Sequence, residues 1–184
     1  MKKEYLLNNA MTDQQELRER FKPGKIKVLF IAESPPKNDT FFYSAKGGFY
    51  SFTKQIFIEL FQEEINKSAD FLHFFQSKGC YLEDLCHETK TYKEICEEIC
   101  ENKNGENDYI EKLQESLALY KPQAIIITLI EIDNFVRDAI NRSNIVITPE
   151  LIFTLPFPGN GNQNEYMGRL WGILPFLNSK NILT

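Results

Sequence analysis

Two strand-like runs, one near each end of the chain, lead directly into polar loops that contain proline. Residues 27–32 (KVLFIA) run into residues 33–38 (ESPPKN), and residues 151–155 (LIFTL) run into residues 156–164 (PFPGNGNQN). Short apolar runs of this kind are typical of buried parallel strands. Ligands of an open α/β sheet bind at the carboxyl ends of its strands. The two loops are therefore predicted to form two walls of one pocket.

Further apolar runs alternate with helical patterns along the chain. This alternation predicts an α/β protein, a three-layer α/β/α sandwich around a four-stranded parallel sheet. We expect a single domain over residues 1–184, since no linker or repeat is visible. The strands are predicted at residues 26–32, 80–86, 124–129 and 150–155. The helices are predicted at residues 10–22, 51–66, 69–77, within 90–107, and at 108–120, 133–141 and 165–174, with a short extended piece at 145–147.

Composition narrows the class of protein. The 184 residues are 42% hydrophobic and 26% charged, which is ordinary for a globular domain. No apolar stretch approaches the ~20 residues of a membrane span, and the start lacks the apolar core of a signal peptide. We therefore expect a cytoplasmic, monomeric protein with reduced cysteines and no membrane partner. The net charge of −5 argues against strong non-specific binding to DNA.

The polar junctions after the four predicted strands all fall on one edge of the sheet. Proline, asparagine and carboxylates are dense there, which favours a functional site over ordinary loops. The junctions are residues 33–38, 83–87, 128–133 and 156–164.

These junctions resemble the motifs of the uracil-DNA glycosylase superfamily. Its first motif, a strand followed by a turn with Glu or Gln and then Pro, matches residues 32–36 (AESPP), and its second matches residues 155–158 (LPFP) with the Asn-rich residues 159–164. Residues 79–85 (GCYLEDL) resemble the strand that carries the family's base-reading Asn, and residues 121–129 resemble its Pro-led third strand. The resemblance covers residues 26–176 and implies hydrolysis of the N-glycosidic bond of a damaged or deaminated base in DNA.

The resemblance implies roles for particular residues. Glu33 and Ser34 take the catalytic positions, Ser34 standing where several branches carry a water-positioning Asp or Asn. Asp84 stands at the place of the base-reading Asn, and Leu155 at that of the His that stabilises the departing base. Leucine carries neither a donor nor a charge, so that route of leaving-group stabilisation is closed. For Glu33 the alternative is a bond to local backbone amides, and for Asp84 a helix cap or a salt bridge.

Base recognition and DNA contact are assigned to two loops. A flipped base is stacked on an aromatic ring, for which Phe42 or Tyr43 is available. The loop after the last strand is expected to contact DNA, helped by the N-terminus of the following helix. Its expected DNA-binding residues are Pro156, Pro158, Gly159, Asn160, Asn162 and Asn164.

Two other functions remain open. One is binding of a nucleobase, nucleotide or nucleic-acid end on the same fold without catalysis, and the other is an unrelated α/β hydrolytic or transferase domain. The charge beside the pocket discriminates between functions that need nucleic acid and functions that do not, because an acidic rim would argue against nucleic acid. A basic groove favouring nucleic acid would use Lys37, Lys46, Lys54 and Arg169.

The cysteines do not form a recognisable metal motif. Cys96 and Cys100 are four residues apart, and Cys80, Cys86 and His87 lie near the end of the second predicted strand. This spacing departs from the Cys-x-x-Cys pattern of zinc sites. We therefore expect no metal and no cofactor.

Overall fold

The protein folds around a parallel sheet of four strands in the order β2-β1-β3-β4. The structure is a computed structural model that describes residues 13–37, 40–62, 68–101 and 108–183. The strands are β1 (Val28–Ala32), β2 (Cys80–Asp84), β3 (Ala124–Ile127) and β4 (Ile152–Thr154). In β1, Val28 is in register with Cys80 of β2 on one side and with Ala124 of β3 on the other. The predicted four-stranded parallel sheet is confirmed, with each strand shorter than its apolar run.

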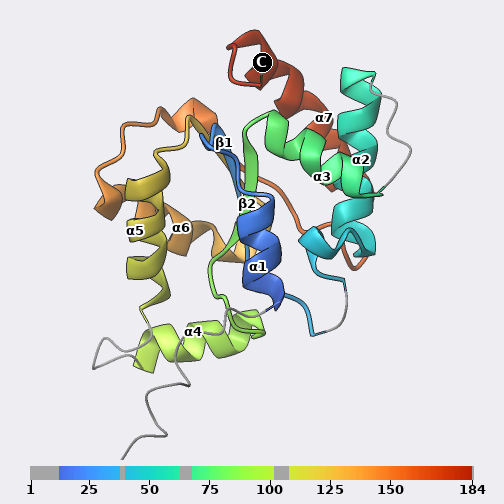
Figure 1. Cartoon of the computed structure of the whole chain (residues 1–184). Helices are drawn as coiled ribbons and strands as arrows, with labels where there is room; N and C mark the ends of the chain where they lie inside the picture. Colours follow the sequence, from blue (N-terminus) through green and yellow to red (C-terminus); the bar gives the residue numbers. More distant parts are fainter. Residues whose placement is uncertain (1–12, 38–39, 63–67, 102–107, 184) are drawn as a thin grey trace, which may run out of the picture.

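Helices cover both faces of the sheet and make the three layers (Figure 1). Helices α2, α3 and α7 lie on one face and α5 and α6 on the other, while α4 lies toward the carboxyl ends of the strands. The helices are α1 (Asp13–Arg20), α2 (Gly47–Phe61), α3 (Ser68–Ser77), α4 (Tyr92–Glu101), α5 (Tyr109–Tyr120), α6 (Asp133–Ser143) and α7 (Gln163–Ser179), with short 3-10 turns η1 (Phe42–Ser44), η2 (Ile130–Ile132) and η3 (Pro149–Leu151).

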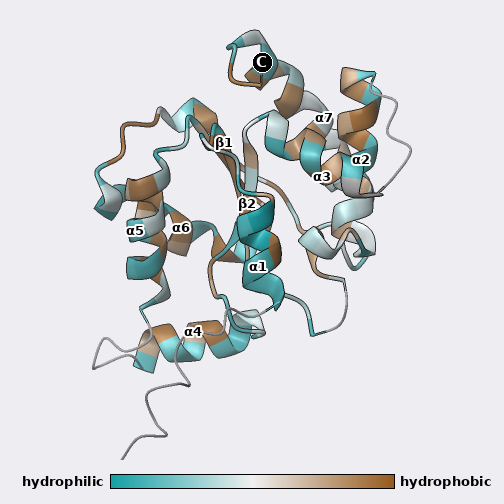
Figure 2. Ribbon diagram, in the orientation of Figure 1, coloured by the Kyte–Doolittle hydropathy of each residue, from teal (hydrophilic) through white to brown (hydrophobic). Residues whose placement is uncertain are grey.

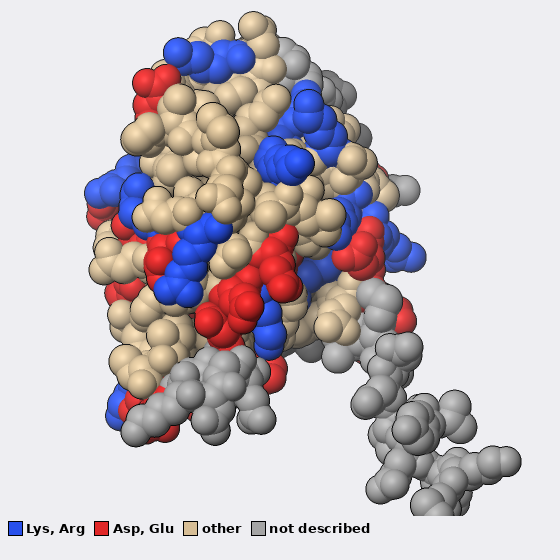
Figure 3. All heavy atoms as spheres, turned by 90° about the vertical axis from the view of Figure 1, so that its left-hand side faces the viewer, with Lys and Arg blue, Asp and Glu red and all other residues tan. Residues whose placement is uncertain are grey.

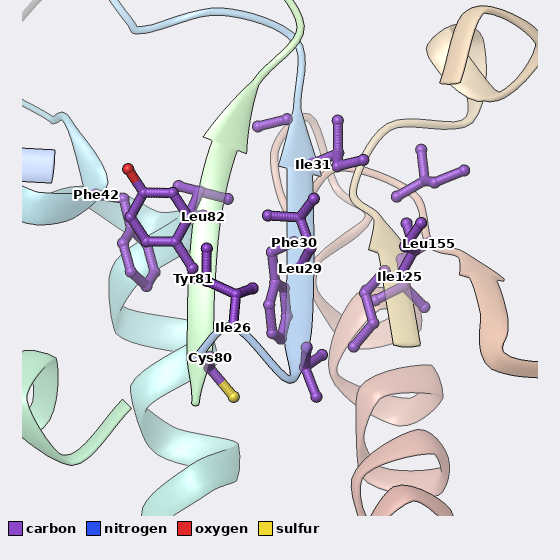
Figure 4. Packing of buried hydrophobic residues seen from close by; sticks show 14 of the residues in the cluster. Ile26, Leu29, Phe30, Ile31, Phe42, Cys80, Tyr81, Leu82, Ile125 and Leu155 are labelled. Carbon is purple, nitrogen blue, oxygen red and sulfur yellow. The ribbon is translucent and has the colours of Figure 1, made fainter. Parts of the chain in front are cut away.

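The core consists of the strands and the apolar sides of the helices. The strands are the most apolar elements, whereas α1 is hydrophilic (Figure 2). Buried side chains of β1 lie between those of β2 and Ile125 of β3 (Figure 4). On the α2 and α3 face, the ring of Phe30 packs 5.2 Å from Phe75 and 6.5 Å from Phe57. Each buried Phe side chain stabilises the fold by about 1.5–3 kcal/mol relative to exposure.

Local signals explain where several elements end. Helix α3 ends just before Gly79, whose φ of +72° only glycine adopts without strain. The Gly79 carbonyl then accepts a hydrogen bond from the Lys27 amide at 2.8 Å, which sets the start of β2 beside β1.

The start of one helix differs from the prediction. Helix α2 begins at Gly47 instead of residue 51, so Gly47 and Gly48 lie in its first turn. Residues 145–147, predicted as a short extended piece, belong to no helix or strand. The predicted start at residues 10–12 and the segments 63–67 and 102–107 lie outside the described residues. Within the described ranges, no helix has the length and apolar character needed to cross a bilayer.

Candidate active site at the carboxyl edge of the sheet

A cavity of about 850 Å³ lies at the carboxyl ends of the strands. This volume is in the range of small-molecule sites. The loops after β1, β3 and β4 and the end of β2 all contribute walls, as the polar junctions predict for one edge of the sheet. The lining comes from residues 32–37, 40–42, 48–49, 82, 84, 89–92, 129–131, 156–160 and 162.

Glu33 places a carboxylate in this cavity directly after β1. Its Oε1 atom is buried and has no hydrogen-bond partner among the described residues. Burial, and then the nearby charges of Glu131 and Asp84, raise the pKa of Glu33, while a backbone hydrogen bond from Tyr92 opposes the rise. A half-buried carboxylate that lines a cavity is suited to accept a proton or a hydrogen bond from a bound molecule.

Asp84 lines the cavity from the end of β2, but its charge is already compensated. Its Oδ2 atom accepts a hydrogen bond from Nη2 of Arg18 in α1, and both side chains are almost fully buried. The Arg18 guanidinium also lies over the ring of Phe41, 5.0 Å from the centroid. Burial raises the pKa of Asp84 to about 6 against the opposing effect of Arg18. Of the roles considered from the sequence, the structure places Asp84 in the salt bridge.

Glu83, the neighbour of Asp84, points to the opposite side of the strand. It is buried and accepts hydrogen bonds from His87 at 2.8 Å and from the Tyr120 hydroxyl at 3.1 Å. The hydrogen bond and charge of His87 lower its pKa against the effect of burial. Alternation along β2 therefore separates the two adjacent carboxylates, and only Asp84 lines the cavity.

Three aromatic rings connect the walls of the cavity. Phe42 of η1 packs 5.4 Å from Phe49 of α2, and Phe49 packs 5.5 Å from Phe157 of the loop after β4. All three line the cavity, and Phe157 is 40% exposed. Phe42 lines the cavity but is almost fully buried, so most of the accessible aromatic surface belongs to Phe49 and Phe157.

Tyr43 does not line the cavity. Its hydroxyl donates to the Leu82 carbonyl at 3.1 Å and accepts from the Leu82 amide at 2.7 Å. Since β2 is an edge strand of the sheet, these two peptide groups would otherwise lack partners on their outer side. The structure thus gives Tyr43 a role in covering this edge, away from the stacking position expected for it.

Leu155 also lies outside the cavity lining. It is fully buried, and its amide donates to the Ile127 carbonyl at 2.8 Å, which continues the pairing of β4 with β3. The side chain is part of the core in Figure 4. The base-binding position expected for Leu155 is thus occupied by a packing residue.

A hydrogen bond between Ser34 and Lys90 connects the loop after β1 to the segment before α4. The Ser34 hydroxyl donates to the Lys90 carbonyl. The Lys90 ammonium contacts Glu98 at 2.7 Å, Glu88 at 2.8 Å and the Tyr109 hydroxyl at 2.8 Å. Ser34 lines the cavity, but its proton is engaged in this contact, so the structure supports a positioning role for it.

The loop after β4 forms the remaining wall. Pro156 and Pro158 are buried and line the cavity together with Gly159, Asn160 and Asn162. Asn160 has a φ of +53°, a conformation that asparagine tolerates, and Asn162 is the N-cap residue of α7. Asn164 lies in the first turn of α7, outside the lining. Of the six residues expected to contact DNA, five line the cavity.

The cavity lining carries one more acidic than basic side chain. The carboxylates are those of Glu33, Asp84 and Glu131, and the lysines are Lys37 and Lys90. Asp84 and Lys90 are compensated by the ion pairs described above. The remaining charged groups of the lining are Glu33, Glu131 and Lys37. Neither of the two carboxylates forms an ion pair among the described residues.

The basic groove expected from the sequence does not form part of the lining. Lys37 lines the cavity, but Lys46, Lys54 and Arg169 do not. Arg169 is paired with Glu165 at 2.6 Å. On the face where α5 and α6 lie, acidic and basic side chains are interspersed, with no continuous basic surface (Figure 3).

The cysteines are dispersed. Cys80 and Cys86 are buried, Cys96 is half-buried and Cys100 is exposed. In the part of the chain that the structure describes, no group of three or more His, Cys, Asp or Glu side chains has a geometry suited to hold a metal ion.

Three residues of the site were not singled out from the sequence. Arg18 lies in a hydrophilic helix, where nothing distinguishes it from exposed arginines. Phe49 lies in the first turn of α2, so its direction depends on where that helix begins. Glu131 lies within the polar junction after β3, so the pattern of junctions indicated its position without its role.

Together these features define a three-layer α/β/α protein with an acidic, aromatic-walled cavity at the carboxyl edge of its sheet. Neither the models of known protein families nor the sequences of curated proteins match this chain.

Proposed function

We propose that this protein is a divergent uracil-DNA glycosylase-like enzyme that hydrolyses the N-glycosidic bond of a damaged or deaminated base. The observation that carries the proposal is the Glu33 carboxylate, which lines a cavity of about 850 Å³ and whose buried Oε1 atom has no hydrogen-bond partner among the described residues. The convergence of four motif-like junctions on this cavity supports the same assignment. DNA is the proposed partner, contacted through the loop that starts at Pro156.

Glu33 is suited to two tasks in such a reaction. Cleavage of an N-glycosidic bond builds positive charge on the sugar, and a nearby carboxylate stabilises that charge. The same carboxylate lines the cavity, where it can accept a proton from the attacking water. Phe49 and Phe157 supply aromatic surface for the base, and Phe42 packs against Phe49.

Two observations favour a second candidate, binding of a nucleobase or nucleotide without hydrolysis. Leu155 is fully buried, so the position that would stabilise the leaving group holds a packing side chain. The lining holds three carboxylates against two lysines, and only Lys37 of the four expected basic residues contributes to it.

Base release from oligonucleotides tests the proposal. The protein is incubated with oligonucleotides that carry uracil, hypoxanthine, xanthine or mispaired thymine, and abasic sites are detected by alkaline strand cleavage. We expect release of at least one base, and loss of that release in Glu33→Gln, which keeps the size of the side chain and removes its charge. A general base contributes roughly 10²–10⁴-fold to the rate, which sets the size of the loss.

Glu111→Gln is the matched control. It removes the same charge from an exposed position in the first turn of α5, outside the cavity lining. Release that survives Glu33→Gln would show that another group is catalytic. If no base is released by the native protein, hydrolysis is rejected, and binding of the same oligonucleotides decides whether the second candidate stands.

A further inference from the structure

We infer that the base accepted by this cavity is a cation: an N-alkylated, positively charged nucleobase in preference to neutral uracil. The inference rests on the proposed function and names its substrate class. It follows from three features of the protein: the charge of the cavity, its aromatic wall, and Leu155, which lies outside the lining and which the resemblance places at the leaving-group position.

The first feature is the uncompensated negative charge. Once the Asp84 and Lys90 ion pairs are set aside, Glu33 and Glu131 remain as carboxylates in the lining against one lysine, Lys37. Burial and the charge of Glu131 both disfavour ionisation of Glu33. A bound cation relieves both costs, whereas uracil brings two carbonyl acceptors that a carboxylate repels.

The second feature is the aromatic wall. Phe49 and Phe157 are partly exposed and line the cavity 5.5 Å apart, and the almost fully buried Phe42 packs against Phe49. The face of an aromatic ring attracts a cation through its quadrupole, and it stacks on a planar heterocycle. A planar cation uses both interactions, and the Glu33 carboxylate supplies the opposite charge. The acidic groups therefore favour a positively charged ligand, and the aromatic groups favour a planar one.

The third feature is Leu155. When water attacks the anomeric carbon of the sugar, the bond from that carbon to the base nitrogen breaks, and its electron pair moves to the base. A neutral base such as uracil then leaves as an anion, which requires a donor or a positive charge beside it. A cationic base leaves as a neutral molecule, and the proton released by the attacking water passes to Glu33. The lack of a donor at Leu155, which the resemblance places at the leaving-group position, is therefore no obstacle for a cationic base.

Binding and release from matched oligonucleotides test this inference. Two single-stranded oligonucleotides differ at one base, which is 1-methyladenine, a cation at neutral pH, or 1-methylhypoxanthine, its neutral isostere. A third carries uracil. Dissociation constants are measured by fluorescence anisotropy and base release by alkaline cleavage. Contacts to the phosphate backbone are common to all three, so the ratio of dissociation constants isolates recognition of the base.

We expect the cationic base to bind about tenfold or more tightly than its neutral isostere, a difference of about 1.4 kcal/mol. Glu33→Gln abolishes the preference, Glu131→Gln reduces it in part because that side chain is exposed, and Glu111→Gln leaves it unchanged. Circular dichroism measures whether each variant is folded. If Glu33→Gln does not fold, the Glu131→Gln variant still tests the inference.

Equal or tighter binding of the neutral isostere overturns the inference, and so does a preference that survives Glu33→Gln. Uracil release without any preference for the cation rejects this substrate class and leaves the proposed function intact. Absence of both binding and release for every base rejects the two together. Free 1-methyladenosine, offered as a competitor, distinguishes a site for nucleosides from one that requires a nucleic-acid strand.

Discussion

Removal of the Arg18 guanidinium should destabilise the protein strongly, although α1 is short and hydrophilic. Both Arg18 and Asp84 are about 95% buried, with side-chain exposures of 5% and 4%. Breaking a buried ion pair by removing one partner costs about 3–5 kcal/mol, because the other charge stays buried. In a domain of this size each kcal/mol shifts the melting temperature by about 2–4 °C, so Arg18→Met should lower it by roughly 10 °C.

A double-mutant cycle separates the ion pair from other contacts of Arg18. Urea unfolding is measured for the native protein, Arg18→Met, Asp84→Asn and the double variant. The contact of Arg18 with the Phe41 ring is lost in both variants that lack the arginine, so it cancels from the coupling energy. We expect a coupling of about 3 kcal/mol, since the double variant buries no uncompensated charge. A coupling below about 0.5 kcal/mol, as for exposed pairs, would refute the reasoning.

The pH dependence of the Arg18→Met variant gives an independent check. The pKa of Asp84 is raised to about 6 with Arg18 present, and removing the guanidinium raises it further. An acid whose pKa is raised in the folded state contributes its full stabilisation below its unfolded pKa, which is ~3.9 for Asp. This stabilisation is lost as the pH rises through the folded pKa. The free energy of unfolding of Arg18→Met should therefore fall furthest below that of the native protein above pH ~6, and the difference should be smallest near pH ~4. A deficit that is constant over this range would show that Asp84 is not the group left uncompensated.

Three further predictions concern the walls of the site and the sheet. Tyr43→Phe leaves a buried amide and carbonyl of β2 without partners and should lower the free energy of unfolding by about 1–3 kcal/mol in urea titrations; a change near zero would mean that water replaces the hydroxyl. The raised pKa of Glu33 should place the acid limb of the pH profile of base release above the position expected for an ordinary glutamate, and Glu131→Gln should move this limb to lower pH; an unmoved limb would assign it to another group. Gly79→Ala adds a Cβ atom 2.7 Å from a lysine side chain at a φ of +72° and should destabilise by at least about 1 kcal/mol, whereas Gly168→Ala, an exposed helical site with open space, should be stabilising by about 0.5–1 kcal/mol; equal melting temperatures for the two would contradict this explanation.

The fold was predictable because its signals are local and repeated. Each strand is an apolar run bounded by polar residues, and a parallel sheet places the ends of all such runs on one edge. This reasoning predicted where Glu33 and Asn160 lie, since both directly follow a strand or its loop. Helix ends were also readable where a special residue marks them, as Gly79 does after α3.

The arrangement of side chains within the site was less predictable because it depends on contacts between distant segments. The ion pair between Arg18 and Asp84 joins residues 66 positions apart, and no periodic pattern identifies it. Phe42 and Tyr43 are adjacent and similar, yet one lines the cavity and the other binds the edge of β2. The direction of the 3-10 turn η1 determines which of the two neighbouring rings lines the cavity. The sequence contains no signal for that direction.

The strand order carries a consequence for how the chain is made. Synthesis completes β1, β2 and β3 before β4 leaves the ribosome, so for that interval the fully buried run Ala124–Ile127 has a free edge. An unpaired apolar edge of this kind invites association with other nascent chains. It is covered by only three residues, Ile152–Thr154, and the same segment leads into the last wall of the cavity. Protection from aggregation and completion of the site should therefore occur in the same late step, and chains truncated before residue 152 should be both insoluble and inactive.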